Sequence, residues 1–224
     1  MKESKYLQEA KKRLTIVFLA FVIAFAGFWV TSDQLILMAE KFYQVSWMAI
    51  KPYEVYFVKA KISAVLSLIM VFPLFIYQIY RFTAPGLKMK EKKILKKSVP
   101  LVIVLTYAGA LLGMTLNSQV LLSFLYASQS AVTSQWTLSG VISFVSMVTL
   151  VSSLFLNIPL LVYSSLDLGI VSVEKLKEYL MHLVALSFLV SALVTPPDPL
   201  SMTVLALLIL GFVCSGVFMY EIKR

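Results

Sequence analysis

Residues 98–166 read SVPLVIVLTYAGALLGMTLNSQVLLSFLYASQSAVTSQWTLSGVISFVSMVTLVSSLFLNIPLLVYSSL, without one charged residue or histidine. A membrane-spanning helix needs about 20 apolar residues, so this stretch is too long for one span. It fits two spans that are joined by an uncharged polar connection. The stretch therefore predicts membrane helices at residues 99–116 and 138–163.

Four more apolar segments outside this stretch have about the length of a span: residues 14–30, 57–80, 180–194 and 200–220. The 224-residue chain is 60% hydrophobic and 14% charged, whereas a soluble domain is about 25% charged. This composition excludes the soluble enzyme classes. We predict an all-α integral membrane protein, with a single transmembrane domain over residues 1–224 that contains six transmembrane helices.

The last two helices are expected to be short. Residues 180–194 cover about 22 Å at about 1.5 Å per residue, against a hydrocarbon core of about 30 Å. Pro196, Pro197 and Pro199 end the fifth helix and hold a tight turn before the sixth. Local thinning of the bilayer would accommodate this pair.

The positive charges predict the orientation of the helices. The net charge is +9, and all 20 Lys and Arg residues except Lys41, Lys51, Lys59 and Lys61 lie in the N-terminal tail, the C-terminal tail or the two connections on the same side. Positive residues concentrate on the cytoplasmic side of membrane proteins. We therefore expect a multi-pass protein of the cell (cytoplasmic) membrane with both termini cytoplasmic. The four exceptions are expected in the first outer loop or at its membrane edge. We interpret the net positive charge as a signal of membrane orientation. We therefore predict that the protein does not bind nucleic acid.

Enzyme chemistry is not indicated by any motif. The sequence has no phosphate-binding glycine loop, no dinucleotide fingerprint and no zinc-protease motif. His182 is the only histidine, and Cys214 is the only cysteine, which excludes an intrachain disulfide. We predict no catalytic residue, no metal site and no cofactor.

Two scarce acids stand out among the basic residues at the membrane surface. Glu9 lies three and four residues before Lys12 and Arg13, and Glu91 is the only acid in a connection with seven basic residues. Each acid could form an ordinary ion pair with a neighbouring cation. Alternatively, the two carboxylates could bind a ligand with paired arginines, because a guanidinium group binds a carboxylate through two hydrogen bonds.

A few other positions near the membrane are polar or interrupt a helix. Pro85 and Gly86 end the second helix, and Asp198 is expected to cap the sixth. Asn157 precedes Pro159 inside the fourth span. A polar side chain at such a depth is a functional candidate, and its structural alternative is a bond to a freed backbone carbonyl or to a neighbouring helix.

Four motifs follow one another along the chain: Leu7–Gln8–Glu9 with Lys12–Arg13, Pro52–Tyr53–Glu54 with Lys61, Phe82–Leu87 with Glu91, and Thr195–Pro199, which reads TPPDP. Together, in this order, they resemble the TatC family, the large membrane subunit of the twin-arginine protein translocase. The resemblance covers essentially the whole chain.

The resemblance implies six helices in a cupped arrangement. It implies that Glu9 and Glu91 bind the twin-arginine signal peptides of folded precursors, with Arg13, Phe82, Pro85 and Leu87 around them. The resemblance also implies that five further residues have a structural role or contact a partner protein: Pro52, Glu54, Asn157, Pro196 and Asp198. It also implies assembly with single-span subunits of the TatA/TatB type and with other copies of the chain in the lipid bilayer, and transport driven by the proton-motive force.

The sequence departs from the family pattern at several positions. Asn157 stands where the family usually has a glutamate, and Met202 stands where it has a glutamine. Ala10 and Lys11 replace a leucine and an arginine of the N-terminal motif. Because an amide does not titrate, the change to Asn157 puts a pH-linked role of this position in doubt.

Two other function classes compete with protein export. A secondary transporter of small molecules or ions is expected to have an ion-coordinating midplane and often internal repeats. The chain has a midplane almost free of charge and no repeat. An intramembrane enzyme would need a nucleophile with a placed base, and none is identifiable.

Overall fold

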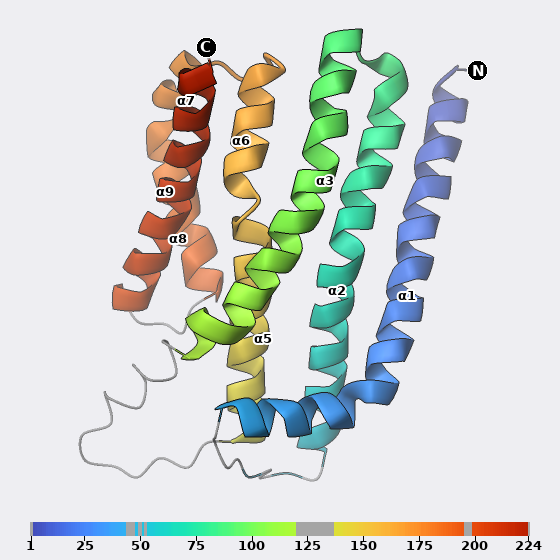
Figure 1. Cartoon of the computed structure of the whole chain (residues 1–224), viewed down its shortest axis with the longest axis vertical. Helices are drawn as coiled ribbons and strands as arrows, with labels where there is room; N and C mark the ends of the chain where they lie inside the picture. Colours follow the sequence, from blue (N-terminus) through green and yellow to red (C-terminus); the bar gives the residue numbers. More distant parts are fainter. Residues whose placement is uncertain are drawn as a thin grey trace. The chain divides into compact units, whose positions relative to one another are not determined.

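The computed structural model describes residues 2–43, 48, 51, 53–119, 137–194 and 199–223. These residues are helical almost throughout (Figure 1), and one isolated bridge joins Met48 to Thr137. The predicted all-α class is therefore confirmed.

Five helices in the described part of the chain are long and apolar enough to cross a membrane: Tyr6–Tyr43, Glu54–Gly86, Lys92–Thr115, Leu138–Asp167 and Leu205–Lys223. Helix α8, Leu180–Val194, has 15 residues and the predicted bounds. Helix α9, Pro199–Lys223, has 25 residues, so the prediction of a short sixth helix is wrong. Its first residue is a proline, which the first turn tolerates, and nothing in Glu221–Lys223 breaks the helix.

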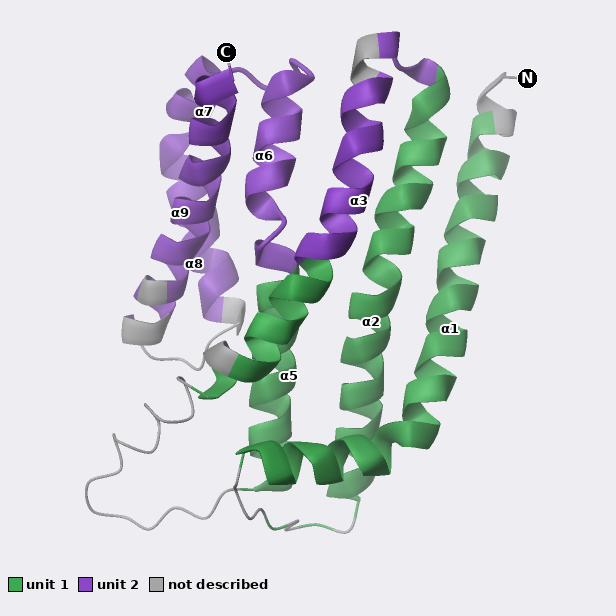
Figure 2. Cartoon of the chain, viewed as in Figure 1, with its two compact units in different colours: residues 1–85, 106–153 green, residues 86–105, 154–224 purple. Residues whose placement is uncertain are grey.

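The chain divides into two compact units (Figure 2). Unit 1 contains Met1–Pro85 and Thr106–Ser153, and unit 2 contains Gly86–Leu105 and Leu154–Arg224. Neither unit is a continuous piece of chain, because helix α3, Met89–Leu112, contributes to both. The interpretation of the whole chain as one transmembrane domain stays a prediction.

Unit 1 begins with a helix much longer than its predicted span. Helix α1, Lys2–Tyr43, runs beside helix α2, Glu54–Thr83, and its last turns bend across the beginning of α2 (Figure 1). The helix continues beyond Val30 because residues 31–43 contain neither glycine nor proline. Lys41 therefore lies in the last turn of α1.

The core of unit 1 joins the bent end of α1 to two other helices. Ile36 of α1 packs with Val58 and Ile62 of α2 and with Leu138 and Ile142 of helix α5, Leu138–Phe155. All five side chains are buried. The beginning of α2 and the beginning of α5 are thus held at the same end of the unit.

Two glycines allow a close approach of α3 to α5 inside unit 1. A β-carbon built on Gly109 would lie 2.5 Å from the carbonyl oxygen of Ser152. One built on Gly113, where a π-helical turn η2, Gly113–Asn117, begins, would lie 2.7 Å from the α-carbon of Thr149. Glycines four residues apart are typical of close packing between membrane helices. The sequence carries this signal, and our sequence analysis missed it.

Unit 2 contains the beginning of α3, helix α6, Ile158–Asp167, helix α7, Val173–Glu178, and the antiparallel pair α8 and α9. The predicted fourth span is interrupted between α5 and α6, where Asn157 is the N-cap of α6 and Pro159 lies in the first turn. Helix α9 also packs closely on α6, since a β-carbon on Gly216 would lie 2.6 Å from the carbonyl oxygen of Pro159.

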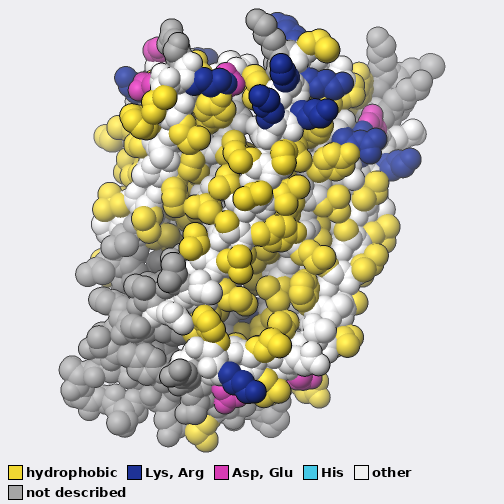
Figure 3. All heavy atoms as spheres, in the orientation of Figure 1, with side chains coloured by type: hydrophobic (Ala, Val, Ile, Leu, Met, Phe, Trp, Pro, Cys, Tyr) yellow, Lys and Arg dark blue, Asp and Glu magenta, His cyan; other side chains and the backbone are white. Residues whose placement is uncertain are grey.

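The surface of the helices has the character of a membrane protein. Large hydrophobic side chains are exposed along their flanks, for example Phe18, Ile23 and Val30 of α1. Figure 3 shows these hydrophobic flanks, with Lys and Arg side chains gathered at helix ends. Continuous exposed apolar surface of this extent marks contact with a membrane or a partner, and the helix lengths favour a membrane.

Candidate functional site

The acid nearest to the N-terminus forms an ion pair along helix α1. Nη2 and Nε of Arg13 donate to Oε1 of Glu9 at 2.5 and 3.2 Å. The spacing of four residues brings the two side chains to one face of the helix, so the predicted pairing of Glu9 with Arg13 is confirmed. The Glu9 side chain remains 42% exposed, whereas that of Arg13 is 17% exposed.

Arg13 has a second partner, on helix α2. Its Nη1 donates to Oε1 of Gln78 at 3.3 Å, and Gln78 is buried. This contact links the first turns of α1 to the last turns of α2. Sequence reasoning missed Gln78, although a lone amide in an otherwise apolar span is a signal for such a role.

A groove of about 140 Å³ lies beside this polar group, within unit 1. Its lining residues come from α1 and α2: Ala10, Arg13, Leu14, Val17, Phe75, Gln78, Ile79 and Phe82. The predicted site residue Phe82 is therefore part of its wall. An exposed carboxylate, a guanidinium group and an apolar groove are adjacent at one end of the helix pair.

The other predicted site residues follow directly in the chain. Pro85 lies exposed in a single 3₁₀ turn, η1, Ala84–Gly86, and Leu87 is partly buried. Glu91 lies in the first turn of α3, where a negative charge is favoured by the helix dipole. Its side chain is outside the described part of the structure. Because Glu9 and Glu91 belong to different units, their action as a pair stays a prediction.

A second polar group lies at the opposite end of α2. The buried Glu54 accepts hydrogen bonds from the backbone N–H groups of Ser139, at 2.8 Å, and Lys51, at 3.3 Å. Lys61 donates from Nζ to Oγ of Ser143 at 2.7 Å. Glu54 and Lys61 therefore both contact the beginning of α5. A carboxylate at a helix N-terminus satisfies free N–H groups and complements the dipole.

We expect Glu54→Ala to lower the free energy of unfolding by about 1–3 kcal/mol, because the partly buried N–H group of Ser139 loses its acceptor. The measurement is the thermal unfolding of the purified protein in detergent. Glu54→Gln, which keeps an acceptor oxygen, should lose less. Asp33→Asn is the matched control, since its exposed ion pair with Lys59 is worth about 0–1 kcal/mol. Equal losses for Glu54→Ala and Asp33→Asn would contradict the capping role.

The remaining predicted positions are placed only in part. Asn157 is 1% exposed at the start of α6. Pro52, Pro196 and Asp198 lie outside the described residues, and so does the cap predicted for Asp198. Among the side chains that the structure describes, no group of three or more His, Cys, Asp or Glu residues could hold a metal ion.

The fold and the site together define a class of protein. The chain is a multi-pass α-helical membrane protein with a carboxylate and a guanidinium group paired near the end of two adjacent helices. Residues 5–207 match the family model described as Sec-independent protein translocase protein (TatC), and the chain belongs to this family. It is accordingly a component of a protein translocase and not an enzyme.

Curated relatives support the family. The chain is 26% identical to TatC of Helicobacter pylori strain J99 over 92% of its own length and 83% of the relative. It is 27% identical to TatCy of Bacillus subtilis over 92% of its length and 84% of that protein. It is 28% identical to chloroplastic TATC of Pisum sativum over 97% of its length, and it spans 63% of the pea protein.

Solved structures support the fold. The crystal structure of the twin arginine translocase receptor TatC superimposes with a TM-score of 0.84 at 24% identity, over 98% of this chain and all of that one. The same receptor crystallised in DDM gives a TM-score of 0.83 at 22% identity. The all-helical TatC fold is thereby confirmed, while the count of six membrane helices and the side of the termini stay predictions.

Proposed function

We propose that this protein is the core subunit of the twin-arginine export system, and that it binds the twin-arginine signal peptides of folded precursors. In this proposal Glu9 and Glu91 each take one arginine of the peptide. The observation that carries it is the ion pair at Glu9. A carboxylate that is 42% exposed already holds a guanidinium group through two of its nitrogen atoms.

Binding requires an exchange of guanidinium groups at Glu9. When a peptide arginine occupies the carboxylate, Arg13 loses that partner but keeps Gln78 as an acceptor. This second acceptor lowers the cost of the exchange, because a half-buried charge with no partner would be expensive. Gln78 is therefore part of the proposed site as a positioning residue for Arg13.

The groove beside Glu9 suits an apolar side chain of the same peptide. Leu14, Phe75 and Phe82 contribute to its wall. One exposed ion pair is worth only about 0–1 kcal/mol, so an apolar contact and a second acid are both needed for useful affinity. Pro85 and Leu87 in the following turn would set the position of Glu91.

The membrane setting of this proposal follows from the charge distribution. Lys11, Lys12 and Arg13 lie at the beginning of α1, and Arg81 lies at the adjacent end of α2. Concentrated positive charge favours the cytoplasmic side. We place both termini there, in the cell membrane, with six membrane helices in a cupped arrangement. The partners are TatA/TatB-like single-span subunits and other copies of the chain, and the proton-motive force drives translocation.

The test of signal-peptide binding is a comparison of two peptides that differ only in their paired residues. A twin-arginine peptide is expected to bind the purified protein about tenfold more tightly than the same peptide with two lysines. Only guanidinium groups bind each carboxylate through two parallel hydrogen bonds. Fluorescence titration measures both affinities, and the lysine peptide controls for net charge. Equal affinities would refute recognition through paired bidentate contacts.

A further inference from the structure

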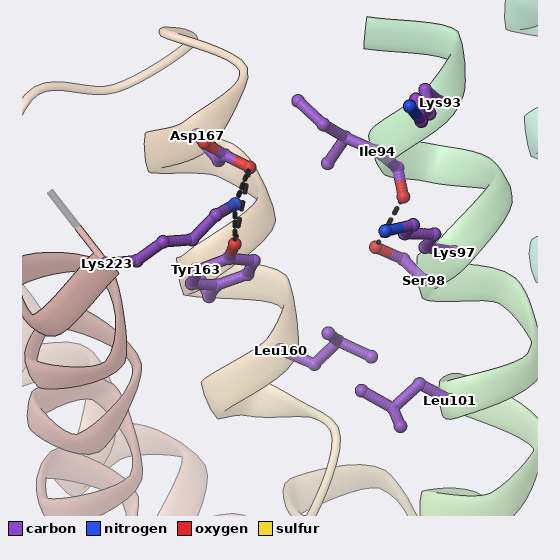
Figure 4. Close-up of a pocket in the computed structure, with 9 residues that line it drawn as sticks. All are labelled: Lys93, Ile94, Lys97, Ser98, Leu101, Leu160, Tyr163, Asp167 and Lys223. Carbon is purple, nitrogen blue, oxygen red and sulfur yellow. Dashed lines mark hydrogen bonds and ion pairs between the residues drawn. The ribbon is translucent and has the colours of Figure 1, made fainter. Parts of the chain in front are cut away.

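Unit 2 contains a hollow of about 380 Å³ at the end where α6 and α9 finish and α3 begins (Figure 4). Nine residues line it: Lys93, Ile94, Lys97, Ser98, Leu101, Leu160, Tyr163, Asp167 and Lys223. None of them belongs to the site proposed for signal peptides. The hollow has the size of many small-ligand sites, which are about 300–1,000 Å³.

The mouth of the hollow carries excess positive charge. Three lysines face one acid, and that acid, Asp167, is already engaged by Lys223 at 3.0 Å. Tyr163 also contacts Lys223 (Figure 4). Lys93 and Lys97 lie one turn apart on α3, and no side chain that the structure describes forms an ion pair with either. Two like charges at this spacing disfavour the helix, and an anion between them would relieve the repulsion.

The interior of the hollow is apolar. Figure 4 shows Leu101 and Leu160 facing each other on the side away from Asp167, and Ile94 pointing between α3 and α6. Leu101 is 44% exposed and lies within Lys92–Thr115, which is long and apolar enough to cross a membrane. An occupant that fills the hollow therefore passes from a basic helix end to the depth of the hydrocarbon core.

We propose that this hollow binds an anionic phospholipid, with its phosphate between the lysines and its first acyl methylenes along Leu101 and Leu160. Basic pockets between membrane helices at the cytoplasmic level are typical sites for anionic head groups. A free phosphate would satisfy the lysines but leave the apolar interior unused. A twin-arginine peptide would be repelled by the lysines, so the assignment does not rest on the proposed function.

The experiment uses the full-length protein, purified in detergent and analysed by native mass spectrometry with added lipid. Phosphatidylglycerol is expected to remain bound, and phosphatidylcholine of the same chain length should bind about tenfold less. Lys93→Gln/Lys97→Gln should lower phosphatidylglycerol binding by about tenfold to thirtyfold, since each lysine contributes substantially to attraction of anionic lipid. Lys175→Gln/Lys177→Gln is the matched control, because it removes equal charge from exposed positions of α7 outside the hollow.

The outcomes separate the lipid from other anions. Leu101→Gln should weaken phosphatidylglycerol binding and leave inorganic phosphate binding unchanged. The proposal is overturned if the lysine pair in the hollow and the pair in α7 have equal effects. It is also overturned if inorganic phosphate alone binds as tightly as the lipid, or if a polyglutamate peptide displaces the lipid with higher affinity. An unchanged melting temperature of each variant shows that it is folded, which the exposure of Lys93 and Lys97 leads us to expect.

Discussion

Glu9→Ala combined with Glu91→Ala is expected to lower the affinity for a twin-arginine peptide by about 100-fold. Each carboxylate would lose a bidentate, charge-assisted contact of about 1.5 kcal/mol, which exceeds the value of an ordinary exposed ion pair because two parallel hydrogen bonds form. Each single variant should lose about tenfold or more. The affinities are measured by titrating a labelled peptide into the purified variants.

Asp33→Ala is the matched control for the acid variants. Asp33 is another exposed acid of α1, and its partner is Lys59 at 2.6 Å. Its removal changes the net charge of the protein by the same amount without touching Glu9 or Arg13. Parent-like affinity in both Glu9→Ala and Glu91→Ala would rule out the proposed site. If Asp33→Ala lowers the peptide affinity by the same factor, the losses in the Glu9 and Glu91 variants reflect only general electrostatic attraction.

Gly109→Leu is expected to destabilise unit 1 by about 3 kcal/mol or more. Even a β-carbon at this position would lie 2.5 Å from the carbonyl oxygen of Ser152 and 2.8 Å from the α-carbon of Ser153. Both are backbone atoms, so a larger side chain forces α3 and α5 apart and overpacks their interface. Thermal unfolding in detergent should show a melting temperature lower by about 5–10 °C.

Gly27→Leu is the matched control for this variant. Gly27 lies within α1, and among the residues that the structure describes no atom outside the adjacent part of its own helix lies within 4 Å of its β-carbon position. Replacing a helical glycine at an open position should leave stability unchanged or raise it by about 0.5–1 kcal/mol. The close approach of α3 to α5 has no energetic importance if Gly109→Leu unfolds at the same temperature as Gly27→Leu.

Local rules predicted a large part of the fold. The bounds of α8 follow from an apolar run that prolines terminate, and the interruption near Asn157 follows from Pro159. The extent of α1 was not predicted, because a hydropathy pattern shows where a chain can cross a membrane and not where its helix ends. Asp33 and Lys41 follow the apolar residues 14–30 and interrupt the hydropathy pattern. Neither residue type ends a helix, so α1 continues through both.

In the candidate site too, contacts within one helix could be predicted from the sequence, whereas contacts between helices could not. The pair Glu9–Arg13 was predictable, because residues four apart on one helix meet whatever the rest of the chain does. The contact of Arg13 with Gln78 joins residues 65 positions apart, and it depends on how α1 packs against α2. The lining of the hollow in unit 2 comes from three helices, and no spacing in the sequence brings them together.

The interleaving of the two units sets the order in which this protein can mature during synthesis. Glu54 receives the amide of a residue 85 positions later, so a ribosome adding about 5–20 residues per second delivers it only after about 4–17 s. During this interval α1 and α2 are already synthesised, but Val58 and Ile62 cannot yet pack against α5, which is synthesised later. The nascent chain therefore passes through a stage in which the core of unit 1 is unfinished and Glu54 still lacks the N–H group of Ser139.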